Sequence, residues 1–556
     1  MKKTMTWSDK LGNPQYGGEI VISSPSNIEN FDPYFSEHLT GIYSAWLERL
    51  ISEDWALDPA IFDYKLIAPH QYLIGLLAEN WEFTEPGTLV FHLHQGIHWQ
   101  DLPPVNGREF TADDVAFHFH RLYGLGSGYT SPPPYHNTVP LFKDLISVSA
   151  IDKYTVAFKW TTHNPEIILQ ALVTNHSPAL VIEAREAVEK WGDLSDWHHA
   201  IGTGPFILED FVSGSSATLV RNPNYWGHDE RHPQNKLPYV DKVKILIIPD
   251  RIKTLEAFLA GKIDAIEGIS VEQAQTIKKT HPEIVQIPIP ASGTTTMDIR
   301  NDKPPFNDVK VRKAMQMAID LPAIAKSHYN GTIEPGPTSL ASSVMKVWGK
   351  GWNFPYEAWP KDLKEEYAYN PMAAKRLLAE AGYPDGFKTN VVAGTDDLKL
   401  LQIIKSYFAQ IDIEMDILPM DSNHKYDQLA YPGGSLGFNV EPFRQLPRLQ
   451  TGNPHNTRLM VSDPMVDTFW PKAQAAGSIE EAKKIFRDAN EYIARQHFAI
   501  SLFQRPMHYS LYQPWLKGYN AQFGAVSWSP PSLSFYTSRF WIDQKLKKSM
   551  GHYSKK

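Results

Sequence analysis

The chain contains no cysteine among its 556 residues. This absence excludes disulfide bonds, thiolate metal sites and a cysteine nucleophile, but it leaves the redox compartment open. No run of about 18 apolar residues occurs, so we expect no membrane-spanning segment. The chain begins with Lys2 and Lys3 but has no apolar stretch behind them, so residues 1–19 do not form a signal peptide. The protein is therefore cytosolic, or the chain is the mature region of an exported protein.

Basic and catalytic signatures are also missing. The formal net charge is −8, and no basic run carries interleaved aromatic residues, so we expect no nucleic-acid partner. The chain has no G-x-S-x-G, H-E-x-x-H or P-loop motif. Asp113 and Asp114 are paired carboxylates, but they follow Thr111 and precede an apolar run, which fits an N-capped helix start. We therefore expect a protein that is not an enzyme.

Histidines gather in one region without forming a metal-binding pattern. His92 and His94 lie two residues apart on an expected strand and would face the same side, and His98 follows closely. No carboxylate or third ligand stands at a spacing typical of a zinc site. We expect no metal and no cofactor.

Aromatic residues are abundant. They make up 12% of the chain, with 16 Trp and 25 Tyr, whereas the hydrophobic content of 42% and the charged content of 21% are ordinary for a globular protein. Most of these rings are expected in the core, and a surplus also fits a wide cleft that holds an organic ligand. One core rarely serves more than roughly 250–300 residues, so two or more lobes are expected.

Strand and helix patterns alternate along the chain. Residues 18–23 are apolar and β-branched and predict a strand, and 41–51 have the apolar spacing of a helix. Residues 242–249 predict a buried strand, followed by a helix over 251–260 that ends at Gly261. Further helices are expected near 309–319, 370–381, 398–409 and 479–496. This order favours an α/β fold with mixed sheets.

Short segments spread over nearly the whole chain carry a resemblance to one family. They are residues 17–33, 77–83, 89–122, 151–160, 202–208, 219–227, 304–320, 369–387 and 516–520. Within them, Gly202 and Gly204 are expected in a tight turn where Cβ atoms would clash. In this order and spacing, the segments resemble the family 5 extracellular solute-binding proteins, which serve peptide, nickel and opine importers.

The resemblance implies a two-lobed periplasmic-binding-protein fold of type II, with mixed sheets flanked by helices and the ligand held between the lobes. The first lobe would contain 17–49, an extra subdomain over 50–200, residues 201–292 and a return over 507–556, and the second lobe would be 293–506. The hinge would lie near 291–296 and 504–509. Such proteins close around their ligand by hinge bending.

The function that the resemblance implies is ligand capture for an ABC-type importer. The protein would bind a small organic solute and deliver it to the transmembrane permease subunits. It would be a monomer in the periplasm or outside the cell, with a lipid anchor at the cell surface as one alternative. A sensor or chaperone of the same fold, or a hydrolase, stays open as an alternative function.

Two loops expected to grip a peptide depart from the family pattern. Peptide-binding members fix the ligand amine with an Asp in a loop that corresponds to 433–443, where Phe438 stands at the Asp position and Glu441 precedes a proline. Dipeptide binders place an Arg after the strand that ends near Ala393, where this chain has Asp396 and Asp397. The cargo would then be a neutral polyhydroxy or a cationic compound, unless the two Asp side chains only cap the next helix.

The remaining candidate ligand contacts lie in polar or aromatic loops. They are Ser24, Ser26, Asn27, Trp348, Trp352, Asn439 and Trp528. The serines and Asn27 follow the first strand, in a loop that faces the ligand in the family, and a plain turn is the alternative. The tryptophans lie in Gly- and Pro-rich stretches that would wall the binding cleft or pack as surface loops.

Overall fold

The computed structural model divides into two compact units. Unit 1 consists of Met1–Ile289 and His508–Lys556, and unit 2 of Pro290–Met507, so the chain passes between them twice. The structure describes residues 12–34, 40–54, 57, 61, 70–131, 144–173, 180–289, 294–334, 336–337, 351–352, 354–394, 398–419, 429–431, 445–453, 456, 458–504, 507–518 and 535–550. Residues 291–293, 505 and 506 of the expected hinge lie outside them, and the lobe and subdomain boundaries stay predictions.

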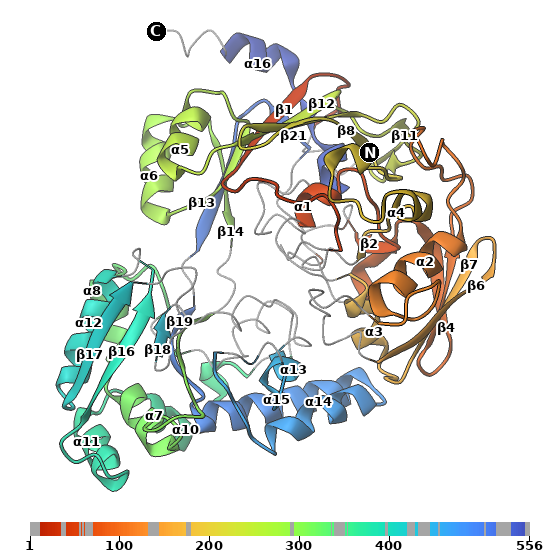
Figure 1. The fold of residues 1–556 in the computed structure, drawn as a ribbon. Coiled ribbons are helices and arrows are strands. Elements are labelled where there is room, and N and C mark those ends of the chain that lie inside the picture. The colour runs from red at the N-terminus through yellow and green to blue at the C-terminus, as the bar shows by residue number, and fades with distance from the viewer. Residues whose placement is uncertain are drawn as a thin grey trace, which may run out of the picture. The chain divides into compact units, whose positions relative to one another are not determined.

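A mixed sheet forms the centre of unit 1 (Figure 1). Its strands, in spatial order, are β1 (Glu19–Ser24), β12 (Lys242–Ile247), β9 (Ser216–Arg221) and β8 (Phe206–Val212). Strands β1 and β12 run parallel, with Ser24 opposite Ile247. Side chains alternate across a strand, and the buried Ile20 and Ile22 enter the core of this unit. The first expected strand is thus confirmed with a shift of one residue.

Three further strands form a separate sheet, of which β13 contacts β1. They are β13 (Ala265–Ile269), β20 (His508–Tyr512) and β14 (Val285–Ile289), with β20 in the middle and antiparallel to both neighbours. Helix α5 (Arg251–Leu259) connects β12 to β13, and α6 (Val271–Thr280) connects β13 to β14. The backbone N–H of Val21 donates to Asp264 Oδ2 at 2.7 Å, and that of Asp264 donates to the Val21 carbonyl at 2.7 Å. These bonds join the start of β13 to β1.

Another sheet of four strands, antiparallel throughout, belongs to the same unit. Its strands, in order, are β4 (Ala78–Glu85), β5 (Thr88–Leu93), β7 (Thr155–Trp160) and β6 (Leu145–Asp152), and helix α2 (Ala112–Tyr123) packs against it. Thr111 is the N-cap of α2, and Asp114 Oδ2 accepts a hydrogen bond from its backbone N–H at 3.0 Å. The paired carboxylates therefore serve a helix start, as expected.

The prediction of a helix over residues 41–51 is wrong. Helix α1 covers only Thr40–Tyr43, and strand β2 (Ile51–Glu53) begins where the expected helix ends. A Cβ on Gly202 would lie 1.6 Å from the Trp46 carbonyl oxygen, and Gly204 N–H donates to that oxygen at 2.9 Å. The glycine turn that the sequence predicts therefore binds the backbone after α1. The carbonyl oxygen of Trp46, which a continuing helix would use for its own hydrogen bond, accepts from this turn instead.

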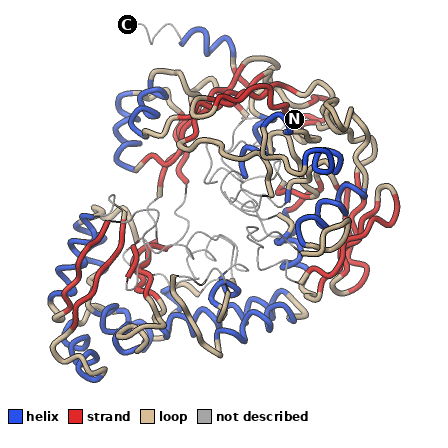
Figure 2. The backbone as a smooth tube through the Cα atoms, viewed as in Figure 1, coloured by secondary structure: helices blue, strands red, loops and turns tan. Residues whose placement is uncertain are grey.

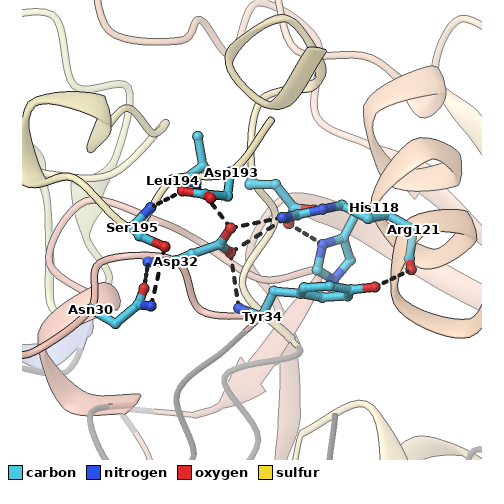
Figure 3. A network of polar contacts seen from close by, with 9 residues as sticks. Asn30, Asp32, Tyr34, His118, Arg121, Asp193, Leu194 and Ser195 are labelled. Atoms are coloured by element: carbon cyan, nitrogen blue, oxygen red, sulfur yellow. Dashed lines mark hydrogen bonds and ion pairs between the residues drawn. The ribbon is translucent and has the colours of Figure 1, made fainter. Parts of the chain in front are cut away.

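A buried ionic network joins four segments of unit 1 (Figure 3). Arg121 on α2 donates to Asp32 Oδ2 at 2.7 Å and to Glu183 Oε1 at 3.1 Å, while His118 pairs with the other oxygen of Glu183. Asp32 also accepts from the Leu194 N–H at 3.0 Å. The four charged side chains are at most 3% exposed. Burial raises the pKa of Glu183, but the charges and hydrogen bonds of His118 and Arg121 outweigh it and lower that pKa to about 2.

The remaining elements of unit 1 are short. They are β3 (Leu73–Gly75), α3 (Pro165–Ala171), α4 (Arg185–Trp191), β10 (His228–Asp229), β11 (His232–Lys236), β21 (Leu516–Lys517), β22 (Trp541–Ile542) and α16 (Gln544–Met550).

Unit 2 is built on one five-stranded mixed sheet, shown in red with its blue flanking helices in Figure 2. The strands, in order, are β17 (Ile413–Pro419), β16 (Phe387–Ala393), β18 (Leu429–Tyr431), β15 (Thr294–Ile299) and β19 (Ala499–Gln504). The helices are α7 (Val309–Met317), α8 (Leu321–Ser327), α10 (Lys361–Tyr367), α11 (Pro371–Glu380), α12 (Leu398–Ala409), α13 (Gln445–Leu449), α14 (Val466–Ala475) and α15 (Ile479–Gln496). The four helices expected in this region are confirmed.

Candidate functional site

Three strands of unit 1 end at one edge of its sheets. Strands β1 and β12 are parallel, and Asp264, just before β13, accepts a hydrogen bond from the Val21 N–H in β1, so β13 starts beside the middle of β1. The start of α5 meets the end of β13, since a Cβ on Gly268 would lie 2.6 Å from Arg251 Nη2. Ligands of open α/β sheets bind outside the carboxyl ends of the strands. This edge is therefore the candidate site.

The loop after β1 uses its polar groups within the unit. Ser24 Oγ donates to the Ser26 carbonyl at 2.8 Å and accepts from the Ser26 N–H at 3.3 Å. Asn27 Nδ2 donates to Ser213 Oγ at 3.0 Å, and Asn27 Oδ1 accepts from the Gly214 N–H at 2.8 Å. These bonds hold the loop against the turn between β8 and β9. Ligand contact by Ser24, Ser26 and Asn27 stays a prediction.

Two basic side chains flank the end of β13. Arg251 is exposed at the first position of α5, and Asp250 caps that helix by accepting from the N–H groups of Ile252 and Lys253 at 2.8 and 3.2 Å. His508 begins β20. Burial, together with the positive charge of Arg251, lowers the pKa of His508. His508 is therefore held toward its neutral form.

Glu267 near the end of β13 is an acidic residue that the sequence predictions did not include. Its Oε1 atom is buried and accepts no hydrogen bond. Burial raises the pKa of Glu267 well above its usual value, and no opposing charge offsets the effect. The sequence signal is a glutamate inside the apolar strand AIEGI. A buried carboxyl oxygen without a donor costs folding free energy, so a donor from outside the chain, such as water or a ligand group, would stabilise it.

A second unsatisfied atom lies on the neighbouring strand. Ile266 pairs with Leu511 and Ile269 with Tyr509, so the irregularity between them sets Glu267 and Gly268 opposite Ser510. Ser510 is fully buried, and its Oγ has no hydrogen-bond partner. Adjacent strands thus place two unsatisfied polar atoms at facing positions. Neighbouring backbone groups are paired in the β20–β14 ladder, so the missing partners belong to the side chains.

Most candidates predicted in unit 2 cannot be placed. Trp348, Asp396, Asp397, Phe438, Asn439 and Glu441 lie outside the described residues, as does Trp528 of unit 1. Trp352 is 4% exposed and packs edge-on against Phe486 of α15, with ring centroids 5.6 Å apart. This packing accounts for the burial of Trp352, and a ligand role for it stays a prediction.

The described residues contain no group of three or more His, Cys, Asp and Glu side chains arranged to hold a metal ion. His94 instead packs beside Trp226, with ring centroids 5.3 Å apart. Within the same described part of the chain, no helix is long and apolar enough to cross a membrane.

Three known proteins are similar to this chain over most of its length. Heme-binding protein A of Haemophilus influenzae is 26% identical over 76% of this chain and 77% of its own length. Glutathione-binding protein GsiB of Shigella flexneri is 25% identical over 85% of this chain and 87% of its own. The ABC transporter-associated periplasmic binding protein DppA of Helicobacter pylori, solved with the peptide STSA, superposes with a TM-score of 0.71 at 20% identity and covers 95% of this chain and 99% of its own.

The family comparison covers most of the chain. Residues 73–440 match the family described as bacterial extracellular solute-binding proteins, family 5. The structural relative is a periplasmic binding protein, and the α/β units with mixed sheets agree with that two-lobed fold. The chain belongs to family 5 of the bacterial extracellular solute-binding proteins, the substrate-binding components of ABC-type importers.

Proposed function

We propose that the protein captures one small organic solute at the carboxyl edge of β1, β12 and β13 and delivers it to the permease subunits of an importer. The observation that carries the proposal is the family match over residues 73–440. The edge supplies the polar loop after β1, the guanidinium of Arg251 and the carboxyl group of Glu267. These groups suit reversible hydrogen bonding to an organic ligand.

The class of solute is wider than any single relative suggests. The relatives bind heme and glutathione by name, and the solved neighbour holds a tetrapeptide. We propose an oligopeptide-like, oligosaccharide or cationic compound. Poor binding of free dipeptides stays a prediction, because Phe438 and the Asp396–Asp397 pair lie outside the described residues.

The proposal includes transport without catalysis. The family consists of transport binding proteins, which act in the periplasm or outside the cell. We propose that this member is a monomer without hydrolytic activity, retained near its permease by a lipid anchor or by the periplasm itself. Ligand-dependent closure at the two chain connections is part of the same proposal.

Thermal-shift screening tests the function. The panel contains glutathione, hemin, di- to nonapeptides, opines, oligosaccharides and polyamines, and a hydrolase substrate panel runs beside it. One ligand class should stabilise the protein by about 2.7 kcal/mol at a hundredfold excess over its dissociation constant. Turnover in the hydrolase panel, without any stabilising ligand, would contradict the proposal.

A further inference from the structure

We propose that Glu267 binds a protonated nitrogen of the solute, so that the cargo is an organic cation or a zwitterion with an accessible cationic group. The inference deepens the proposed function and rests on it. The carboxyl group and the Ser510 hydroxyl together would form the subsite at the end of β13.

The geometry of the two strands supports this subsite. Glu267 Oε1 and Ser510 Oγ are both buried and both lack a hydrogen-bond partner. The irregular pairing of β13 with β20 brings the two residues to facing positions. Asp264, just before β13, accepts from the Val21 N–H and from Trp515 Nε1 at 2.7 and 2.5 Å, so its carboxylate is satisfied. Glu267 Oε1, near the other end of the strand, has no such donor.

The chemistry of these atoms selects a cationic donor. An ionised carboxylate only accepts hydrogen bonds, and a hydroxyl can accept as well as donate. An ammonium carries three donors and a guanidinium five, so one such group could satisfy both atoms. A charged donor gives a shorter and stronger hydrogen bond to a carboxylate than a neutral one. A neutral polyhydroxy compound would leave Glu267 protonated and could form only neutral hydrogen bonds with it, which are weaker than charge-assisted ones.

The charged groups around the subsite predict how binding depends on pH. Arg251 on α5 lies against Gly268, His508 begins β20, and Asp264 precedes β13 at its other end. Without ligand, burial raises the pKa of Glu267. A bound cation lowers that pKa again, so cation binding releases a proton and strengthens as the pH rises from 5 to 8.

Titration calorimetry with small cations tests the subsite. Agmatine and putrescine are the probes, and 1-butylurea is a neutral compound of similar size. Both cations should bind the wild-type chain, and Glu267→Gln should weaken their binding roughly ten- to hundredfold. Glu256→Gln is the matched control, because Glu256 is an exposed carboxylate on the neighbouring helix α5. The Glu256→Gln control should leave the affinity for the two cations unchanged. Titrations of the wild type in buffers of different ionisation enthalpy should give binding heats that differ, because a proton is released on binding.

The outcomes separate this inference from the proposed function. Equal binding of agmatine by the wild type and by Glu267→Gln, equal binding of 1-butylurea, or no binding of either cation would each overturn the subsite. If a solute from the thermal-shift panel still binds in those cases, the transport function stands and only the role of Glu267 fails. A single cooperative melting transition of Glu267→Gln without ligand, matching that of the wild type at pH 5, shows that the variant is folded.

Discussion

Two places in unit 1 differ in how far the polar atoms of their acidic residues are satisfied. In the ionic network, Asp32 and Glu183 share Arg121, and His118 completes the set. At the end of β13, the Oε1 atom of Glu267 has no hydrogen-bond donor, and no opposing charge offsets the burial of the carboxyl group. A satisfied network holds segments together, because removing one member exposes the others to the cost of burial. An unsatisfied carboxyl contributes no such link, which makes it available to a ligand.

Arg121→Met should give the largest effect and tests the structural half of this comparison. The substitution leaves Asp32 and Glu183 buried without their shared cation, so we expect a loss of about 3–5 kcal/mol in the free energy of unfolding. Urea denaturation followed by tryptophan fluorescence measures it. Arg185→Met is the control, because Arg185 forms an exposed pair with Glu189. The control should cost less than about 0.5 kcal/mol. Similar losses in both variants would remove the distinction between the network and a surface pair.

Asp298→Asn in unit 2 should give the next largest effect, as a gain in stability. Asp298 is buried, accepts from Thr296 Oγ1 at 2.9 Å through one oxygen, and has no partner at Oδ2. Burial raises its pKa to about 7, although the Thr296 hydrogen bond and the charge of Arg458 oppose it. The folded state therefore binds the proton on Asp298 more tightly than the unfolded state does. The stability that this proton contributes is lost as the pH rises through 7.

The measurement for Asp298→Asn compares unfolding at two pH values. The free energy of unfolding of the variant should equal that of the wild type near pH 4. At pH 8 it should be larger than that of the wild type by about 2–4 kcal/mol. Because Glu48, whose pKa burial also raises to about 7, stays in both proteins, the difference between them isolates Asp298. A difference that does not depend on pH would show that Asp298 stays ionised in the folded chain.

Glu267→Gln tests the other half of the comparison in the absence of ligand. The raised pKa of Glu267 means that its ionisation becomes costly to the folded state as the pH rises. We expect equal stability of the two proteins at pH 5 and a gain of about 1–3 kcal/mol for the variant at pH 9. Differential scanning calorimetry across this range measures the gain. A loss of stability at every pH would place Glu267 with the structural network.

Asn27→Ala should give the smallest change. The variant loses two partly exposed hydrogen bonds to Ser213 and Gly214, worth about 1 kcal/mol together. If Asn27 only fixes the loop after β1, solute affinity should fall little once the protein is folded. A larger loss of affinity than of stability would show that Asn27 contacts the ligand. Isothermal titration with the solute found by thermal shift separates the two cases.

Local sequence patterns predicted helices and strands more reliably than they predicted contacts between distant parts of the chain. The capped start of α2 and the helix over Ile479–Gln496 follow from residues close together in the chain, and both are present. The expected helix over 41–51 fails because Trp46 meets Gly202, more than 150 residues away in sequence, and no local pattern carries that contact. Ser24, Ser26 and Asn27 were predicted as ligand contacts because they lie at the end of a strand, and that role stays a prediction. Glu267 was missed because its significance lies in the absence of a partner, which only packing reveals.

The sequence alone determined the class of this protein: an α/β solute-binding chain of family 5, since the order of its short segments spans most of its length. It also indicated that no metal pattern or familiar catalytic motif is present. The tertiary structure decided which polar side chains find hydrogen-bond partners within the protein. Arg121, Asp32 and Glu183 satisfy one another across three segments, whereas Glu267 and Ser510 lie at facing positions with unsatisfied atoms. Hydrogen-bond satisfaction depends on neighbours that folding brings from distant parts of the chain, so a sequence cannot show it.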